Sequence, residues 1–217
     1  MQIKKRTGLE MTTTVYLLRH GKTIGDNERR YKGHTDVPLS DDGIRQAARS
    51  AQYIKKHAAT GIQCIYCSDL SRTIESAEMI GKPFDLTPIK VAGLRERHFG
   101  RWEGMTFDEV SQTYPQEFDQ WAKNPLAFSP IDGESTLDVS ARVIPAFYDI
   151  LTGHRNESIV VVAHGGVNRV ILATLLGAPL ENLFRIEQDF NCINIIEFHE
   201  DLPVVKALNY VAEFNCP

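Results

Sequence analysis

The sequence predicts an α/β fold in which a mostly parallel central sheet lies between helices, with a small helical cap inserted at about residues 100–135. Short apolar runs rich in β-branched residues alternate with amphipathic helical segments, a pattern typical of a parallel sheet covered on both faces. Residues 100–135 interrupt this pattern with two short helical pieces and several prolines. Because 217 residues can bury one sizeable core, we expect a single domain over residues 14–217.

The elements of the N-terminal half follow from local patterns. Thr14 to Leu18 is an apolar run of β-forming residues, which predicts a buried strand. Ser40 is placed to cap a helix from Asp41, because apolar residues then recur at spacings of three and four as far as Ile54. A second strand, a second helix and a weaker third strand are predicted at Ile62–Cys67, Leu70–Ile80 and Leu86–Leu94.

The C-terminal half begins with the cap, whose short helices are predicted at Thr106–Tyr114 and Pro115–Lys123. Ser135 and Asp138 have the spacing of a capping box and predict the start of a long helix. The remaining elements are a strand, a helix and a final hairpin, at Ser158–Ala163, about Val167–Leu176, and Cys192–Phe198 with Val204–Tyr210.

The composition narrows the classes of partner. The formal net charge of −4 makes nucleic acid or an anionic membrane an unexpected partner, so any bound anion must be held by a local cluster of cations. No apolar run approaches the roughly 18 residues that span a bilayer. Residues 1–13 are expected to be a leader or a disordered tail, and basic Met1–Arg6 is not followed by the apolar segment of a secretory signal. A cytoplasmic location is the default expectation.

Cys64 and Cys67 have the spacing of a redox or zinc-binding pair. Both lie in a predicted strand, where side chains three residues apart point to opposite faces, and the sequence holds no second such pair to complete a zinc site. We therefore expect ordinary strand residues. The other histidines show no metal-ligand spacing either, and His57, His154 and His199 are expected at the surface.

Two polar clusters follow predicted strands. Arg19-His20-Gly21 follows the first strand, and His164-Gly165-Gly166 follows the Ser158–Ala163 strand and precedes a helix. The carboxyl ends of parallel strands meet at one edge of a sheet, where folds of this class bind ligands. Guanidinium and imidazole groups beside glycines and a helix N-terminus suit an oxyanion. Each cluster alone is also compatible with a surface ion pair and a packed histidine.

Six blocks occur in order between about residues 14 and 212: Tyr16–Thr23, Gly33–Ser40, Ser68–Thr73, Leu94–Gly104, Asp132–Ser135 and Ala163–Gly166. Together they resemble the histidine phosphatase superfamily, the phosphoglycerate-mutase-like proteins. The resemblance implies that His20 is the nucleophile that forms a phosphohistidine, that Arg19 and Arg72 bind phosphate, and that His164 steadies the transferring group. Glu96 would protonate the leaving oxygen and then act as base on water. His20 must attack as a neutral imidazole, with its other nitrogen held by a hydrogen bond to backbone.

The resemblance also implies a wider substrate-binding set and no cofactor or metal ion. This set is Arg19, Gly21, Gly33, Arg72, His98, His164 and Gly165. Many relatives have an asparagine six positions after the nucleophile. Here that position is Asp26 and the next is Asn27, so both are candidates, and Lys22 is a candidate to offset the charge of Asp26.

The expected activity is metal-independent hydrolysis of a small-molecule phosphate monoester. The blocks Phe99–Gly104 and Gly133–Ser135 are similar to those of α-ribazole phosphatases of cobalamin biosynthesis, which makes α-ribazole 5′-phosphate the first candidate substrate. A phosphoglycerate mutase or a broad-specificity phosphatase is the alternative, and a non-catalytic phosphate-binding protein is a third hypothesis. The expected partner is the small-molecule phosphate ester, with the protein a monomer or a homodimer.

The aromatic residues of the cap have two interpretations. Phe107, Phe118, Trp121 and Phe128 fit a bulky aromatic leaving group, and they equally fit core packing within the cap. Trp102 is expected either to line the pocket with His98 or to anchor the cap.

Overall fold

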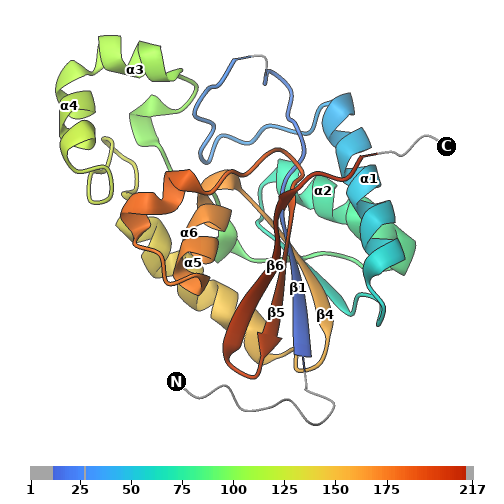
Figure 1. Ribbon diagram of the computed structural model, residues 1–217. Coiled ribbons are helices and arrows are strands. Elements are labelled where there is room, and N and C mark those ends of the chain that lie inside the picture. Colours follow the sequence, from blue (N-terminus) through green and yellow to red (C-terminus); the bar gives the residue numbers. More distant parts are fainter. Residues whose placement is uncertain (1–11, 27, 214–217) are drawn as a thin grey trace.

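The sheet consists of β1 (Thr12–Arg19), β2 (Cys64–Cys67), β3 (Ile89–Lys90), β4 (Ser158–Ala163), β5 (Ile193–His199) and β6 (Leu202–Tyr210). The computed structural model describes residues 12–26 and 28–213, and within them these six strands form one sheet of order β3-β2-β4-β1-β5-β6 (Figure 1). The pairings β1/β4, β4/β2 and β2/β3 are parallel. The C-terminal hairpin of β5 and β6 adds to β1 in the antiparallel sense. The expected mostly parallel α/β sheet is confirmed, and the hairpin makes it mixed.

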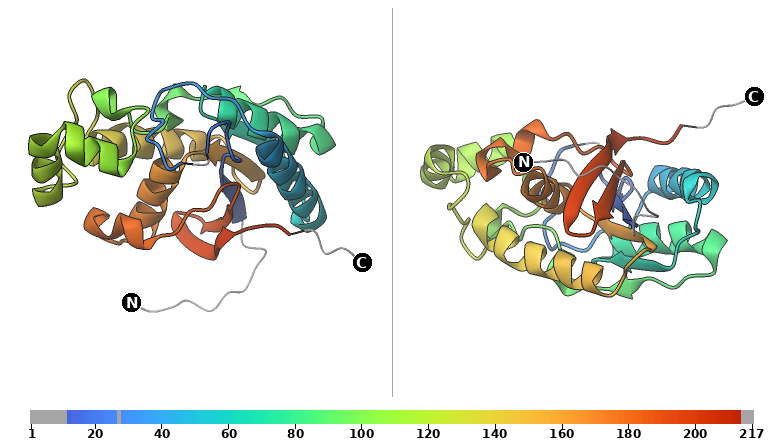
Figure 2. Two further views of the ribbon diagram at one scale, coloured as in Figure 1. Left: turned by 90° about the horizontal axis from the view of Figure 1, so that it is seen from above. Right: turned by 60° about the horizontal axis from the view of Figure 1, so that its bottom comes forward.

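Helices cover both faces of the sheet (Figure 2). On one face lie α1 (Asp41–His57) and α2 (Ser71–Gly81), and on the other lie α5 (Thr136–Thr152) and α6 (Gly165–Leu175). Among the described residues, no helix combines the length and apolar character needed to cross a membrane.

Successive side chains of a strand point to opposite faces of the sheet, so one strand can contribute to two separate hydrophobic cores. In β1, Val15 packs into the core shared with α5 and α6, whereas Tyr16 packs into the core shared with α1 and α2. The apolar middle of β1, residues 15–18, therefore supplies both layers at once. The same alternation puts Cys64 against the first core and Cys67 within the second, so the two side chains lie on opposite faces as predicted. Both thiols are free, and Cys67 is buried whereas Cys64 is only partly buried.

The cap consists of α3 (Phe107–Thr113) and α4 (Pro115–Lys123), which project to one side of the sheet (Figures 1 and 2). Phe107, Phe118 and Trp121 pack against one another with ring centroids 4.9–5.8 Å apart. Trp102 is 2% exposed, stacks on Phe128 and donates from Nε1 to Glu117 of α4 at 3.1 Å, so it anchors the cap.

Several boundaries differ from the predictions. β1 begins at Thr12, two residues before the expected start of the domain, and residues 1–11 lie outside the described part of the chain. The third strand shrinks to two exposed residues, because as an edge strand it pairs with β2 alone. α6 begins at Gly165 rather than Val167, because His164 already occupies the N-cap position.

The prediction of surface histidines holds for one of the three. His57 is exposed at the end of α1. The side chains of His154 and His199 are only 12% and 16% exposed, which corrects their expected place. Each pairs with a neighbouring glutamate, Glu157 or Glu197, and a hydrogen-bonded ring can be partly buried at little cost.

Candidate active site

The paired ends of β1 and β4 bring the two polar clusters together. Arg19 at the end of β1 lies opposite Ala163 at the end of β4, so the residues that follow, His20 and His164, are neighbours. Their rings meet edge to face with centroids 5.2 Å apart. Both side chains are buried, at 5% and 0% exposed.

His20 has the form of a neutral nucleophile. Its Nδ1 lies 2.7 Å from the carbonyl oxygen of Gly21. Because a carbonyl only accepts, Nδ1 carries the proton and Nε2 keeps its lone pair. Burial, followed by the charges of Arg72 and Arg19, lowers the pKa of His20 well below its ordinary value. The imidazole is therefore uncharged at neutral pH, and the expected hydrogen bond to backbone is present.

Backbone carbonyls hold the guanidinium groups of Arg19 and Arg72, the two arginines expected to bind phosphate. Arg72 is 1% exposed, and its Nη2 and Nη1 donate to the carbonyls of Gly33 and Thr35 at 2.7 and 3.0 Å. Arg19 donates from Nη1 to the carbonyl of Gln188 at 2.6 Å, and its guanidinium lies 3.8 Å from the centroid of the Phe190 ring. Each guanidinium group is thus fixed in orientation before a ligand binds.

Three buried nitrogens around His20 are left without a hydrogen-bond partner. Within the described residues these are Nε of Arg19, Nε of Arg72 and Nδ1 of His164. An unsatisfied buried polar group costs about 1–3 kcal/mol, so native proteins seldom keep one unless a ligand or water completes it. Three such groups around a neutral imidazole fit the oxygens of a phosphoryl group.

Glu96 lies at the N-terminus of α6, on the same cavity as His20. Its Oε1 accepts from the amide of Arg97 at 2.9 Å and its Oε2 from the amide of Gly166 at 3.0 Å. A Cβ at position 166 would lie 2.6 Å from Oε1, so only glycine allows the carboxyl group to come this close. The neighbouring Arg95 does not pair with Glu96, because its guanidinium group pairs with the carboxylate of Asp69 at 2.6 Å.

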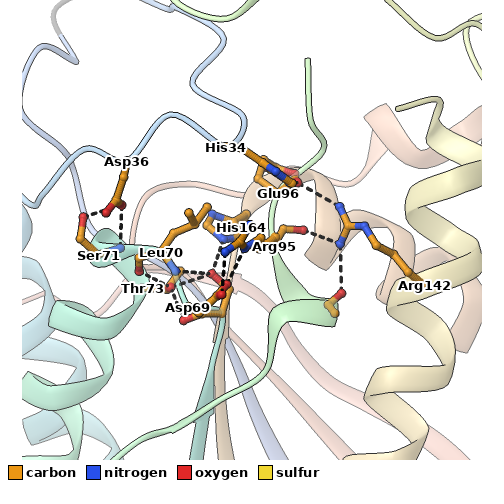
Figure 3. Close-up of polar contacts among 12 residues, drawn as sticks. His34, Asp36, Asp69, Leu70, Ser71, Thr73, Arg95, Glu96, Arg142 and His164 are labelled. Carbon is orange, nitrogen blue, oxygen red and sulfur yellow. Dashed lines mark hydrogen bonds and ion pairs between the residues drawn. The ribbon is translucent and has the colours of Figure 1, made fainter. Parts of the chain in front are cut away.

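Arg142 of α5 holds the main chain beneath Glu96 (Figure 3). It donates to the carbonyls of Arg95 and Glu96 at 2.7 and 2.9 Å and to both carboxylate oxygens of Glu134. Burial works to raise the pKa of Glu134, but the bonds from Arg142 and the His98 amide outweigh it and lower the pKa. The segment carrying Glu96 is therefore tied to a long helix.

Asp26 lines the cavity. The lysine that pairs with its carboxylate is Lys32, and not Lys22, the candidate expected from the sequence. The Asp26 carboxylate also accepts from the amide and hydroxyl of Thr23 at 2.7 and 2.8 Å. Burial favours a higher pKa for Asp26, but the bonds from Lys32 and Thr23 outweigh it, so the pKa lies below the ordinary value. Asn27, the other candidate, lies outside the described residues.

The cavity has a volume of about 650 Å³ and extends from His20 to the cap. Gly33 lines it with a φ of +49°, a left-handed conformation that favours glycine, and Gly165 lines it at the start of α6. Trp102 lines it as well as anchoring the cap.

Gly21 and His98 are not among the residues that line this cavity. A Cβ on Gly21 would lie 2.6 Å from the carbonyl oxygen of Gly43, so Gly21 is needed for the close approach of α1. The His98 ring lies against that of His34, tilted by 35° with centroids 4.7 Å apart, and Nε2 of His98 lies 3.6 Å from Oε1 of Glu103. Gly21 also holds Nδ1 of His20 through its carbonyl, and the substrate-binding roles expected of Gly21 and His98 stay predictions.

Sequence reasoning missed several residues of the site. Lys32, Gln188 and Phe190 are in loops, with no motif to mark them. Ser68 and Glu134 belong to the blocks already noted, which is the one signal that could have singled them out. Among the residues that the structure describes, no group of three or more His, Cys, Asp or Glu is arranged to hold a metal ion.

Comparisons with known proteins agree with this geometry. The chain is 31% identical over 193 residues to phosphoserine phosphatase 1 of Hydrogenobacter thermophilus, covering 89% of this chain and 90% of that protein. It is 32% identical over 196 residues to the bifunctional protein Rv2228c of Mycobacterium tuberculosis, but spans only about half (53%) of that protein's length.

Solved structures share the whole fold. YhfR of Bacillus stearothermophilus matches with a TM-score of 0.81 and 33% identity, over 90% of this chain and 96% of that one. A putative α-ribazole-5′-P phosphatase from Escherichia coli K-12 matches with a TM-score of 0.84 and 26% identity, over 93% of this chain and 98% of that one. The family model described as histidine phosphatase superfamily (branch 1) matches residues 15–211, and the chain belongs to this superfamily, whose members are phosphatases and mutases.

Proposed function

We propose that this protein is a metal-independent phosphatase that hydrolyses a small-molecule phosphate monoester through a phosphohistidine at Nε2 of His20. The observation that carries the proposal is the buried neutral imidazole with its free Nε2, surrounded by the unpaired nitrogens of Arg19, Arg72 and His164. Phosphoryl transfer needs mainly positioning and charge stabilisation, which these fixed groups supply.

In the first step, the lone pair of His20 Nε2 attacks phosphorus and the ester P–O bond breaks. The leaving oxygen takes a proton from the protonated carboxyl group of Glu96 and departs as the alcohol. The phosphoimidazolium that forms keeps its proton on Nδ1, held by the carbonyl of Gly21. Arg19 and Arg72 stabilise the charge on the phosphoryl oxygens.

In the second step, the Glu96 carboxylate takes a proton from water, and the water oxygen attacks phosphorus. The P–N bond breaks, inorganic phosphate is released and His20 returns to its neutral form. Dividing the reaction at a phosphohistidine replaces one difficult displacement by two easier ones.

The decisive experiment measures phosphate release from p-nitrophenyl phosphate in the presence of EDTA. We expect turnover by the wild type, none above background by His20→Ala, and wild-type turnover by His57→Ala, a matched control because His57 is exposed on α1. A quench in detergent at alkaline pH with ³²P-labelled substrate should leave label on the wild type alone, and this label should be lost on treatment with acid. Turnover that requires an added divalent cation, or that survives in His20→Ala, would contradict the proposal.

The cavity supports a substrate with a bulky apolar leaving group. Phe107, Trp121 and Phe184 line it, and Phe107 and Phe184 are 46% and 64% exposed without a ligand. Clustered exposed aromatic side chains are typical of ligand-binding walls. α-Ribazole 5′-phosphate joins its phosphate to a ribose and an aromatic base, and a structural neighbour carries its name. It is our first candidate substrate.

A panel of monoesters tests this preference. α-Ribazole 5′-phosphate should have a higher kcat/KM than phosphoserine or glycerol 3-phosphate. Phe107→Ala and Trp121→Ala should raise KM for the aromatic ester about tenfold, the loss of one aromatic contact, and leave KM for phosphoserine unchanged. Tyr148→Ala is the control, because Tyr148 is an exposed aromatic residue on α5 outside the cavity lining.

Mutase activity is the second candidate, because Arg29 and Arg169 place further cations on the cavity wall, where a substrate carboxylate could bind. A mutase would return the phosphoryl group to a second hydroxyl of phosphoglycerate. Incubation with 3-phosphoglycerate and a bisphosphate primer, followed by ³¹P NMR, distinguishes the two activities, since we expect inorganic phosphate rather than 2-phosphoglycerate.

A further inference from the structure

Ser68, at the end of β2, connects the second histidine to a chain of buried hydroxyl groups. Its Oγ lies 2.7 Å from Nε2 of His164 and 2.8 Å from Oγ1 of Thr73, and it accepts from the amide of Leu70 at 3.4 Å (Figure 3). Ser68, Thr73 and His164 are all 0% exposed. The mechanism above uses none of these hydroxyl groups.

The proton of His164 must be on Nδ1 when an anion is bound. Burial, with the nearby charge of Arg72, lowers the pKa of His164 well below its ordinary value, so the ring has a single N–H. Nδ1 of His164 is one of the three unpaired buried nitrogens around His20, with Nε of Arg19 and Nε of Arg72. A lone pair there would face the phosphoryl oxygens and repel them, whereas an N–H donates to them.

With its proton on Nδ1, His164 can only accept at Nε2. The group at hydrogen-bond distance from Nε2 is the hydroxyl of Ser68, which must therefore donate its proton to the ring. The Ser68 oxygen can then only accept, from the amide of Leu70 and from the hydroxyl of Thr73. The single proton of Thr73 is shared between this oxygen and the carbonyls of Ser68 and Leu70, which lie 2.9 and 2.8 Å from Oγ1. In the opposite tautomer Nε2 would donate to Ser68, and Nδ1 would present its lone pair to the anion.

We propose that Ser68, supported by Thr73, is a positioning residue that holds His164 as the Nδ1–H tautomer, so that the neutral ring donates a hydrogen bond to the phosphoryl group. The inference rests on the proposed function, since it assigns a task to His164 in that reaction. Ser68 touches neither the substrate nor the reacting atoms, and no covalent bond forms at it.

The tautomer is measured directly by ¹⁵N NMR of histidine-labelled protein, with and without vanadate as a phosphoryl analogue. The signal of His164 is assigned by its loss in His164→Asn. We expect protonation at Nδ1 in the wild type in both states. In Ser68→Ala without vanadate we expect the proton on Nε2, and vanadate binding at least tenfold weaker. Protonation at Nε2 in the wild-type vanadate complex would overturn the inference.

Kinetics give the matching readout. Ser68→Ala should lower kcat about 10²-fold, the loss of one transition-state donor, with a smaller change in KM. Ser68→Thr keeps the hydroxyl and should recover most of kcat. Ser158→Ala is the matched control, because Ser158 is a buried serine, bonded to Thr60 at 3.1 Å, at the opposite end of β4. Wild-type kcat and tautomer in folded Ser68→Ala would refute the role.

The two proposals fail in distinguishable ways. A wild type without turnover on any ester, but with an Nδ1–H tautomer that binds vanadate, would end the phosphatase proposal and leave the role of Ser68 in anion binding intact. Turnover abolished by His20→Ala but unaffected by Ser68→Ala would do the reverse.

Discussion

Single residues of this site act through fixed geometry. Both Nη groups of Arg72 donate to backbone carbonyls, those of Gly33 and Thr35, and Nε is left without a partner within the protein. A guanidinium can do this because its five N–H groups form a rigid plane, whereas an ammonium is a compact point charge. We therefore expect the planar shape of Arg72 to matter for activity as much as its charge.

Arg72→Lys should therefore lower kcat by about 10²–10³, the usual cost of one donor to the transition state. The lysine keeps the charge but cannot bind two carbonyls and a phosphoryl oxygen together. Steady-state kinetics on p-nitrophenyl phosphate measure the effect. Arg45→Lys should have wild-type kcat, because Arg45 pairs with Asp42 on the exposed face of α1. Activity within a factor of two for Arg72→Lys would disprove the geometric argument.

Asp26 and Lys32 should behave as a coupled pair, because their side chains are only 13% and 18% exposed and each neutralises the other. We expect Asp26→Asn and Lys32→Gln each to lower the free energy of unfolding. The double variant should lose less than the sum of the two by about 1 kcal/mol. Urea unfolding of the four proteins gives this coupling energy, and strictly additive losses would contradict the pairing.

At the scale of elements, the site depends on how α6 begins. His164 is its N-cap residue, Gly165 its first residue, and the amide of Gly166 holds the carboxylate of Glu96. Helix and acid must approach so closely that position 166 has no room for a side chain.

Gly166→Ala should displace Glu96 and lower kcat at least tenfold while the protein stays folded, because alanine is the better helix former. Gly153→Ala is the control: its Cβ would have its nearest neighbour 3.9 Å away, at the end of α5. Circular dichroism reports folding and steady-state kinetics report kcat. Full activity in Gly166→Ala would show that Glu96 does not need this contact.

At the scale of the whole molecule, the fold keeps two imidazoles neutral inside a cluster of cations. The pKa values of His20 and His164 are lowered by burial and by Arg72. The unfolded chain restores both groups to an ordinary value near 6.5. Below that pH, these two histidines bind protons in the unfolded state but stay neutral in the folded state.

Stability should consequently fall as pH drops below about 6.5, and should not depend on these two groups above it. Each histidine that stays neutral contributes a slope of up to about 1.4 kcal/mol per pH unit. Urea unfolding between about pH 7.5 and 5.5 measures this slope. His20→Asn should reduce it, and His57→Asn should not. An unchanged slope in His20→Asn would contradict the lowered pKa.

Local patterns in the chain were enough for the order of elements and for the placement of the two polar clusters at strand ends. The apolar run of β4 and the capping box at Ser135 were correctly predicted, because both depend on residues near each other in sequence. The parallel pairing of β1 and β4 then brought Arg19, His20 and His164 together as expected.

By itself, then, the sequence determined the fold, its superfamily and the chemical identities of Arg19, His20, Arg72, Glu96 and His164. Tertiary structure alone decided which groups support them: Lys32 for Asp26, Ser68 for His164, and Arg142 for the backbone of Glu96. The physical reason is that strand and helix patterns repeat over a few residues, whereas a buried side chain takes whichever donor or acceptor packing brings within 3 Å, however distant in the chain.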